Sequence, residues 1–228
     1  MNIHLTYFLI LGCTLAGPLL LSFDRKVAFY KKWKRLFPAM VLPAVFYVAW
    51  DIYFTSKGVW SFNEAYITGA KLFNLPVEEL LFFFVVPYCA VFIYECIRCY
   101  FPRVKNKKNG NRVLMVLALV LLSAGIYFSN RHYSSWTFIF NAVFIALLFL
   151  FADFFKAFDA TAFLLSFVIT LLPFLVVNGF LTSIPVVIYN DAENMGIRIF
   201  TIPVEDVFYG MLLLLMNISV YEKLLKRK

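Results

Sequence analysis

Charged residues are scarce in this chain of 228 residues, where Asp, Glu, Lys and Arg together make up 15%, against about 25% in a typical soluble domain. Four cysteines are too few for a disulfide-stabilised scaffold. The glycine-rich dinucleotide fingerprint, the Walker loop, the HExxH motif and the GxSxG elbow are all missing from the sequence. These absences exclude an ordinary soluble domain, and they predict a protein without a bound dinucleotide, flavin, other cofactor or metal.

Hydrophobic residues are abundant instead, at 63% of the chain, and phenylalanine alone contributes 28 residues. A membrane-spanning helix needs about 20 mainly apolar residues, and seven such windows can be drawn. The sequence therefore predicts an all-α polytopic membrane protein with seven transmembrane helices. The approximate windows are 3–23, 36–54, 76–97, 113–128, 135–154, 160–181 and 203–224.

Basic residues are distributed unevenly between the two sides of the predicted membrane. Seventeen of the 21 Lys and Arg fall after the first, third and fifth windows or in the C-terminal tail. The other four are Lys57, Lys71, Arg131 and Arg198. Because Lys and Arg collect in cytoplasmic loops, we expect a multi-pass protein of the cytoplasmic membrane with its N-terminus outside and its C-terminus inside. Anionic membrane lipids explain the net charge of +8, so no nucleic acid partner is expected.

The sequence contains an internal repeat. Residues 63–95 align without gaps on residues 190–222, with nine identical pairs in 33 positions that include Asn, Gly, Pro, Glu and Tyr. We predict a first unit of three helices at 1–100, a connector with the fourth helix at 101–130, and a second unit at 131–228. Each unit has three helices, and the connector helix returns the chain to the side of the membrane from which the first unit started. The two units therefore cross the membrane in the same direction. Such symmetry suits a long ligand with two similar ends.

Each copy of the repeat begins a predicted helix with Pro-Val and two acidic residues, Glu78 and Glu79 in the first copy and Glu205 and Asp206 in the second. A charge inside the membrane costs about 2.5 to 3.5 kcal/mol. A single copy would be explained by the helix dipole alone, but two copies, with Asp51 at the outer end of the second window, favour a layer of carboxyl groups. Desolvation and nearby like charges favour the protonated form, so at least one carboxyl group is expected to act as a proton donor.

Three more residues complete the predicted site. Asn178 stands in the second copy where the first copy has its aspartate, at the outer end of a helix. Phe82 and Tyr209 each follow an acidic residue by one helical turn, and aromatic rings stabilise a cation that faces them. Since these rings follow Glu78 and Glu205 by four residues, we predict that these two glutamates form the pair that points inward.

Acidic residues also lie at the opposite ends of two helices. Glu95 and Glu222 are close in sequence to Arg98 and Lys226, so local ion pairs one turn apart are expected there. The single CxxC motif at 96–99 has no second cysteine pair, and it does not predict a zinc site.

The doubled Pro-Val-acidic-acidic helix starts, the aspartate at the end of the second window and the phenylalanine-rich third window together resemble the small membrane lycopene cyclases. The resemblance covers nearly the whole chain, and the sequence looks like a fused form of the two-polypeptide bacterial enzyme. It implies an isomerase that needs no redox step. An acid protonates C2 of the linear end, the 5,6 double bond attacks the cation at C1, and loss of the C6 proton closes a β-ring.

The resemblance implies lycopene as the substrate and β-carotene as the product, formed through γ-carotene. It also implies contact with membrane lipids and association with other carotenoid enzymes. The residues that it marks as catalytic candidates are Glu78, Glu79, Glu205, Asp206 and Asp51. The residues expected to contact the substrate are Phe82, Tyr209 and Asn178.

Two alternatives stay open at this stage. A related cyclase that forms ε- or γ-rings, or that acts on C50 carotenoids, would carry the same residues, because the ring type depends on which proton leaves. A proton-coupled transporter built from two repeats also places acidic residues at one depth in the membrane. The predicted helices lack the interruptions near the membrane centre that are typical of such transporters.

Overall fold

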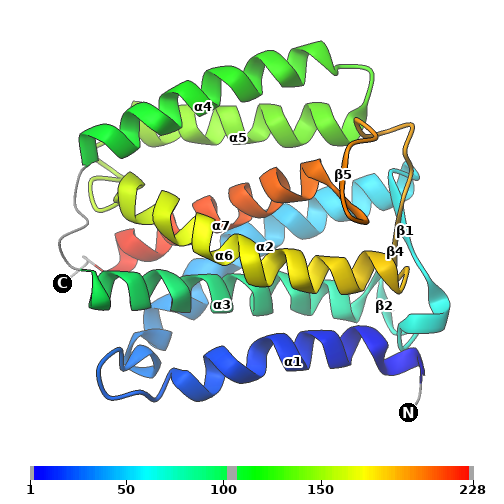
Figure 1. Ribbon diagram of the computed structural model, residues 1–228, viewed down its shortest axis with the longest axis horizontal. Coiled ribbons are helices and arrows are strands. Elements are labelled where there is room, and N and C mark those ends of the chain that lie inside the picture. Colours follow the sequence, from blue (N-terminus) through cyan, green and yellow to red (C-terminus); the bar gives the residue numbers. More distant parts are fainter. Residues whose placement is uncertain (1–2, 102–106, 226–228) are drawn as a thin grey trace.

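The computed structural model describes residues 3–101 and 107–225. Over these residues it is mostly helical, and its seven long helices are each apolar enough to cross a membrane (Figure 1). The helices are α1 (Thr6–Leu21), α2 (Trp33–Ser56), α3 (Val77–Tyr100), α4 (Lys107–Tyr127), α5 (His132–Leu150), α6 (Ala160–Ser183) and α7 (Val204–Leu225). The prediction of seven helices that are long and apolar enough to span a membrane is confirmed.

Several helices extend beyond the predicted windows. α2 begins at Trp33 and α4 at Lys107, because polar and basic residues continue a helix past its apolar part. Four helices also contain proline, which membrane helices tolerate because neighbouring groups satisfy the freed backbone carbonyls. These prolines are Pro18, Pro38, Pro43, Pro87 and Pro173.

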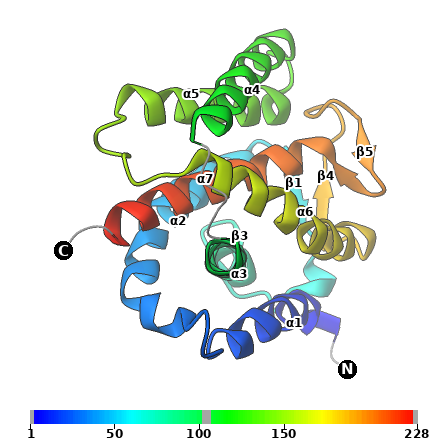
Figure 2. The same cartoon turned by 60° about the vertical axis from the view of Figure 1, so that its left-hand side comes forward.

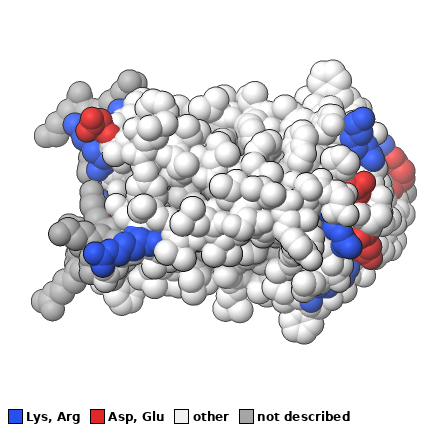
Figure 3. Space-filling view, turned by 90° about the horizontal axis from the view of Figure 1, so that it is seen from above, with Lys and Arg blue, Asp and Glu red and all other residues white. Residues whose placement is uncertain are grey.

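Charged side chains gather at the two ends of the bundle, and the face drawn in Figure 3 has an uncharged belt between them. One end carries the N-terminus and the short strands, and we call it the strand end (Figure 1). The charge pattern predicts that the strand end lies outside the cell. Five of the basic residues counted for that prediction lie outside the described residues, namely Arg103, Lys105, Lys226, Arg227 and Lys228.

Short strands at the strand end were not predicted. β1 (Trp60–Phe62) pairs antiparallel with β4 (Val187–Tyr189), and Ser61 stands opposite Ile188 at the centre of the ladder. β1 and β4 are 127 residues apart, the same offset as in the sequence repeat. The two copies therefore meet at this ladder with corresponding residues placed symmetrically around its centre.

Two small hairpins also correspond at this offset. They are formed by β2 (Lys71–Leu72) with β3 (Leu75–Pro76), and by β5 (Arg198–Ile199) with β6 (Ile202–Pro203). Phe73 and Phe200 at their tips both have φ of 56°, a left-handed conformation that is rare for a bulky residue. Each hairpin leads directly into the helix that carries an acidic pair. The chain therefore enters α3 and α7 through hairpins of the same local geometry.

α3 lies at the centre of the bundle. Figure 2 shows it nearly end-on, with α1, α2, α6 and α7 around it. α4 lies at the periphery, where it packs against α5 and α6. The acidic residues at the starts of α3 and α7 are all buried, with exposed fractions of at most 7%.

The acidic residues at the end opposite the strands connect helices. Glu95 and Glu222 are both buried. Arg98 lies 3.8 Å from Glu95, as the local pairing predicted, but it is hydrogen-bonded to Glu222 of α7, and Lys32 pairs with Glu95. The predicted local pair of Glu95 and Arg98 is thus confirmed, and packing also brings each glutamate a partner from another element. The expected partner Lys226 lies outside the described residues.

Candidate active site

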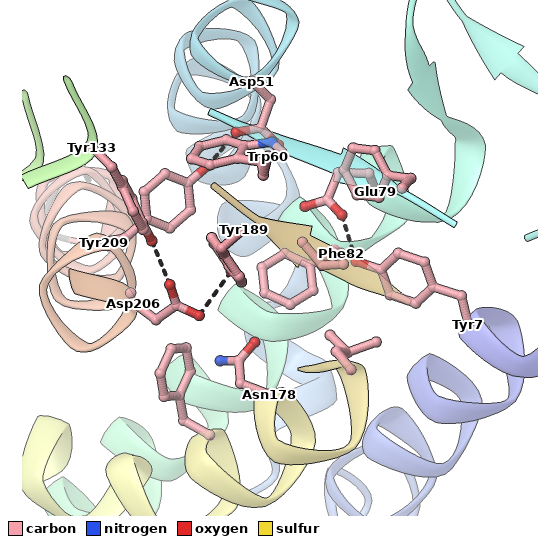
Figure 4. A pocket seen from close by; sticks show the side chains of 15 residues that line it. Tyr7, Asp51, Trp60, Glu79, Phe82, Tyr133, Asn178, Tyr189, Asp206 and Tyr209 are labelled. Atoms are coloured by element: carbon pink, nitrogen blue, oxygen red, sulfur yellow. Dashed lines mark hydrogen bonds between the residues drawn. The ribbon is translucent and has the colours of Figure 1, made fainter. Parts of the chain in front are cut away.

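A buried cavity of about 40 Å³ lies near the strand end, where α2, α3, α6 and α7 meet β1 and β4 (Figure 4). Acidic, tyrosine and other aromatic side chains point into it. Ten of its lining residues are Tyr7, Asp51, Trp60, Glu79, Phe82, Tyr133, Asn178, Tyr189, Asp206 and Tyr209. Six of the eight predicted site residues are among them.

Three of the five predicted carboxyl groups line the cavity. They belong to Asp51 of α2, Glu79 of α3 and Asp206 of α7, whose exposed fractions are 1%, 7% and 3%. The carboxyl groups of Asp51 and Glu79 face the same small cavity from two different helices. Burial and a nearby like charge both favour the protonated form of a carboxyl group. This shared site therefore suits a pair of carboxyl groups that keeps a proton.

Tyrosine hydroxyls support this carboxyl pair from both sides. The hydroxyl of Tyr7 donates to Oε2 of Glu79 at 2.6 Å, and the hydroxyl of Tyr209 donates to Oδ1 of Asp51 at 2.5 Å. The pair is thus fixed in place by groups from α1 and α7.

Asp206 has a different environment, because its two oxygens accept from two tyrosines. Tyr133 donates to Oδ1 at 2.5 Å and Tyr189 donates to Oδ2 at 2.9 Å (Figure 4). Burial and the neighbouring Asp206 raise the pKa of the Tyr189 hydroxyl well above its ordinary value, so this group remains a donor. With a tyrosine donor on each oxygen, the carboxyl group of Asp206 is held in a fixed orientation.

Glu78 and Glu205 are fully buried, yet they do not line the cavity. Oε1 of Glu78 accepts from the backbone N–H of Thr68 at 2.8 Å, and Oε1 of Glu205 accepts from that of Met195 at 2.7 Å. Thr68 and Met195 correspond in the repeat. The two glutamates therefore hold the preceding loop against the start of each helix.

The prediction that Glu78 and Glu205 form the inward pair is consequently wrong. Successive residues of an α-helix point about 100° apart, and the phase of α3 and α7 turns Glu79 and Asp206 to the cavity instead. Phe82 and Tyr209, which were used for that prediction, do line the cavity. They lie on the same side of the helix as residues three positions earlier, and those residues are Glu79 and Asp206.

Sequence reasoning missed three of the four tyrosines that line the cavity, namely Tyr7, Tyr133 and Tyr189. Tyr7 and Tyr133 play corresponding parts toward Glu79 and Asp206, but they are 126 residues apart, so a gapless alignment at 127 does not pair them. Tyr189 lies one residue before the start of the aligned segment. Extending the alignment of the two copies toward the N-terminus, with the offset changed from 127 to 126, would have paired Tyr7 with Tyr133.

A large apolar groove lies beside the cavity, between α1, α3 and α6, with a volume of about 770 Å³. Its lining includes Leu172 and Phe180, which are 73% and 54% exposed, so the groove opens on the apolar flank of the bundle. Phe82, Phe174 and Asn178 line both the groove and the cavity. A chain-like apolar molecule in the groove would thus have one end beside the carboxyl groups.

Two parts of the chain match a known protein family. Residues 4–97 and 130–224 match a family model described as lycopene cyclase. The chain belongs to the lycopene cyclase family. The parts that match this family contain all residues of the cavity, whereas the peripheral helix α4 lies between them.

Two fungal proteins named bifunctional lycopene cyclase/phytoene synthase are similar to parts of the chain. The protein from Leptosphaeria maculans is 32% identical over 96 residues, which cover 40% of this chain and 15% of that protein. The protein from Aspergillus niger is 24% identical over 82 residues, or 33% and 14% of the two chains. The similarity therefore spans about a seventh of each relative's length. No solved structure matches this member of the lycopene cyclase family.

Gly210 of α7 provides a test of the passage between cavity and groove. A Cβ at this position would lie 2.8 Å from the ring of Phe174, so Gly210→Ala forces this ring to move. We expect the rate of product formation to fall by about 10-fold or more, since small displacements near reacting atoms have large kinetic effects. Measuring turnover and the melting temperature of the purified variant checks this expectation.

Gly17→Ala is the matched control for this substitution, because a Cβ at Gly17 meets no atom within 4 Å. Alanine also favours a helix over glycine, so the control should keep the parent's turnover and melting temperature. Equal turnover in the two variants would show that the position of Phe174 does not matter.

Proposed function

We propose that the protein is a lycopene β-cyclase, an isomerase that closes the linear ends of lycopene into β-rings and yields β-carotene through γ-carotene. The observation that carries the proposal is a cavity lined by the carboxyl groups of Asp51, Glu79 and Asp206, next to an apolar groove. Membership of the lycopene cyclase family supports a carotenoid substrate. The β-ring, rather than an ε- or γ-ring, rests on the sequence resemblance.

In this mechanism the pair of Asp51 and Glu79 supplies the proton, and we assign Glu79 as its donor. The proton adds to C2 of the linear end, and the positive charge appears at C1. The electrons of the 5,6 double bond then form the C1–C6 bond, which moves the charge to C5. Because no electrons are gained or lost, the reaction needs no oxidant or reductant.

Asp206 completes the reaction as the carboxylate that faces the cation. Preorganised charges aimed at a developing charge are usually the largest contribution to catalysis, and Tyr133 and Tyr189 hold Asp206 in place for this role. Loss of the C6 proton to Asp206 gives the 5,6 double bond of a β-ring. The rings of Trp60, Phe82 and Tyr209 line the same cavity, and their π-faces stabilise the cation.

We also propose a place for this reaction in the cell. The charge pattern supports a protein of the cytoplasmic membrane, with two parallel units at 1–100 and 131–228, a connector at 101–130, the N-terminus outside and the C-terminus inside. Lycopene would then enter from the bilayer, among membrane lipids. The names of the fungal relatives join a lycopene cyclase with a phytoene synthase, which supports association with other carotenoid enzymes.

Expression in bacteria that accumulate lycopene tests the function directly. We expect extracts to contain β-carotene, with some γ-carotene, when pigments are separated by HPLC. A product with ε- or γ-rings would reject the β-specific part and keep the cyclase. Unchanged lycopene beside a well-expressed protein in the membrane fraction would reject the cyclase and favour a transporter.

A further inference from the structure

We propose that the groove between α1, α3 and α6 holds the polyene chain of the substrate, and that the corresponding groove of the other half is closed by aromatic side chains. One chain of this protein thus binds one carotenoid end at a time. This inference rests on the proposed function, because it assigns the groove to a long isoprenoid substrate.

The size and lining of the groove fit such a chain. On α1 it extends from Thr6 to Pro18, about 18 Å at 1.5 Å per residue, so it takes part of a long molecule and leaves the rest outside. Small side chains such as Cys13, Thr14 and Ala90 keep it wide. Ligand pockets of several hundred Å³ with mainly apolar walls bind molecules of this kind.

The corresponding place in the second half lies between α2, α5 and α7, and it is filled. The rings of Trp50 and Phe140 are 4.9 Å apart, those of Tyr53 and Trp136 are 5.2 Å apart, and those of Trp136 and Phe140 are 5.4 Å apart. Phe46 adds a further contact with Phe140 at 5.6 Å. We call these five residues the aromatic plug.

Corresponding positions explain the difference between the two sides. Val177 of the groove corresponds to Trp50 at the offset of 127, and Thr14 corresponds to Phe140 at the offset of 126 that relates Tyr7 to Tyr133. In both pairs a small groove residue is replaced by a large plug residue. The repeat predicted a symmetric site for a ligand with two similar ends. The two halves do contribute corresponding tyrosine and acidic residues to the cavity. They differ in the approach to it, which is an open groove in one half and the aromatic plug in the other.

Filling the groove with the residues of the plug tests this inference. We expect Thr14→Phe and Val177→Trp to prevent binding of the chain while the carboxyl groups stay in place. Each is combined with Glu79→Gln, so that bound lycopene is not converted. The proteins are purified in detergent from cells that accumulate lycopene, and the lycopene retained per protein is measured by HPLC.

Each double variant should retain at least about 10-fold less lycopene than Glu79→Gln alone, which corresponds to about 1.4 kcal/mol. The control is Leu20→Phe in the same background, because Leu20 lies on α1 outside the groove with 74% of its surface exposed. It should retain as much lycopene as Glu79→Gln alone. Gel filtration and the melting temperature identify a variant that fails to fold, and the other groove variant then decides.

Equal lycopene in all folded variants would overturn the inference. Loss of phospholipid with unchanged lycopene would overturn it as well, because the groove would then hold a lipid chain. The binding experiment and the test of the proposed function can fail independently. A parent protein that retains lycopene in the groove and forms no ring would refute the cyclase and keep the binding site.

Discussion

The substitution Glu79→Gln is expected to lower the rate of ring formation by about 10²- to 10⁴-fold, the usual contribution of a positioned general acid. Glutamine has nearly the same shape and still accepts a hydrogen bond from Tyr7, so the geometry of the cavity is kept. It has no proton to donate to C2. Rates are measured with purified protein and lycopene in lipid vesicles, with pigments separated at fixed times.

Glu78→Gln is the matched control because Glu78 is the preceding residue, is also buried and has the same carboxyl group. Its Oε1 accepts from the backbone of Thr68, and glutamine can accept there too. The control should keep most of the parent's activity. If Glu78→Gln were inactive and Glu79→Gln active, the residue facing the cavity would not be the acid, and our assignment would fail.

The substitution Asp206→Asn is expected to have the second largest effect, a loss of about 10²- to 10³-fold in turnover, similar to removal of one preorganised group that stabilises a developing charge. The amide is neutral, so the cation loses its counter-charge and the C6 proton loses its acceptor. Substrate binding should be preserved. Lycopene retained by purified Asp206→Asn should therefore equal that retained by Glu79→Gln.

Glu205→Gln provides the control for Asp206→Asn, since Glu205 contacts Met195 and Ser134 instead of the cavity. A small loss of stability and little loss of turnover are expected. Tyr133→Phe and Tyr189→Phe should each weaken turnover less than Asp206→Asn, because each removes one of two donors. Full activity of Asp206→Asn would show that the base and counter-charge lie elsewhere.

The sequence was sufficient to predict the helices and the gathering of carboxyl groups. Long apolar windows separate helices from loops by composition alone, and the repeat placed two acidic pairs and Asp51 at one depth. It was not sufficient to say which acid of each pair faces inward. That choice depends on the rotation of α3 and α7, which is set by the loop bonds of Glu78 and Glu205 and by two hairpins with left-handed phenylalanines.

The groove could not be predicted for a related reason. Its walls come from α1, α3 and α6, and a sequence repeat does not show which helices of one half pack beside those of the other. The side chains of the aromatic plug look like ordinary lipid-facing aromatics until their neighbours are known. The antiparallel ladder of β1 and β4 could not be predicted from the sequence either, because strands of three residues have no periodicity that distinguishes them from loops.

The aromatic plug has a consequence for the order of products. On the proposed function, a carotenoid with two linear ends presents only one of them while its chain lies in the groove between α1, α3 and α6. The second ring would then require that the molecule leave, reverse and return, so that the enzyme would work distributively. We expect monocyclic γ-carotene to be released and to compete with fresh lycopene, with a share that rises when lycopene is in excess. The ratio of enzyme to pigment in the membrane, in addition to the chemistry of the cavity, would thereby set how many rings each molecule carries.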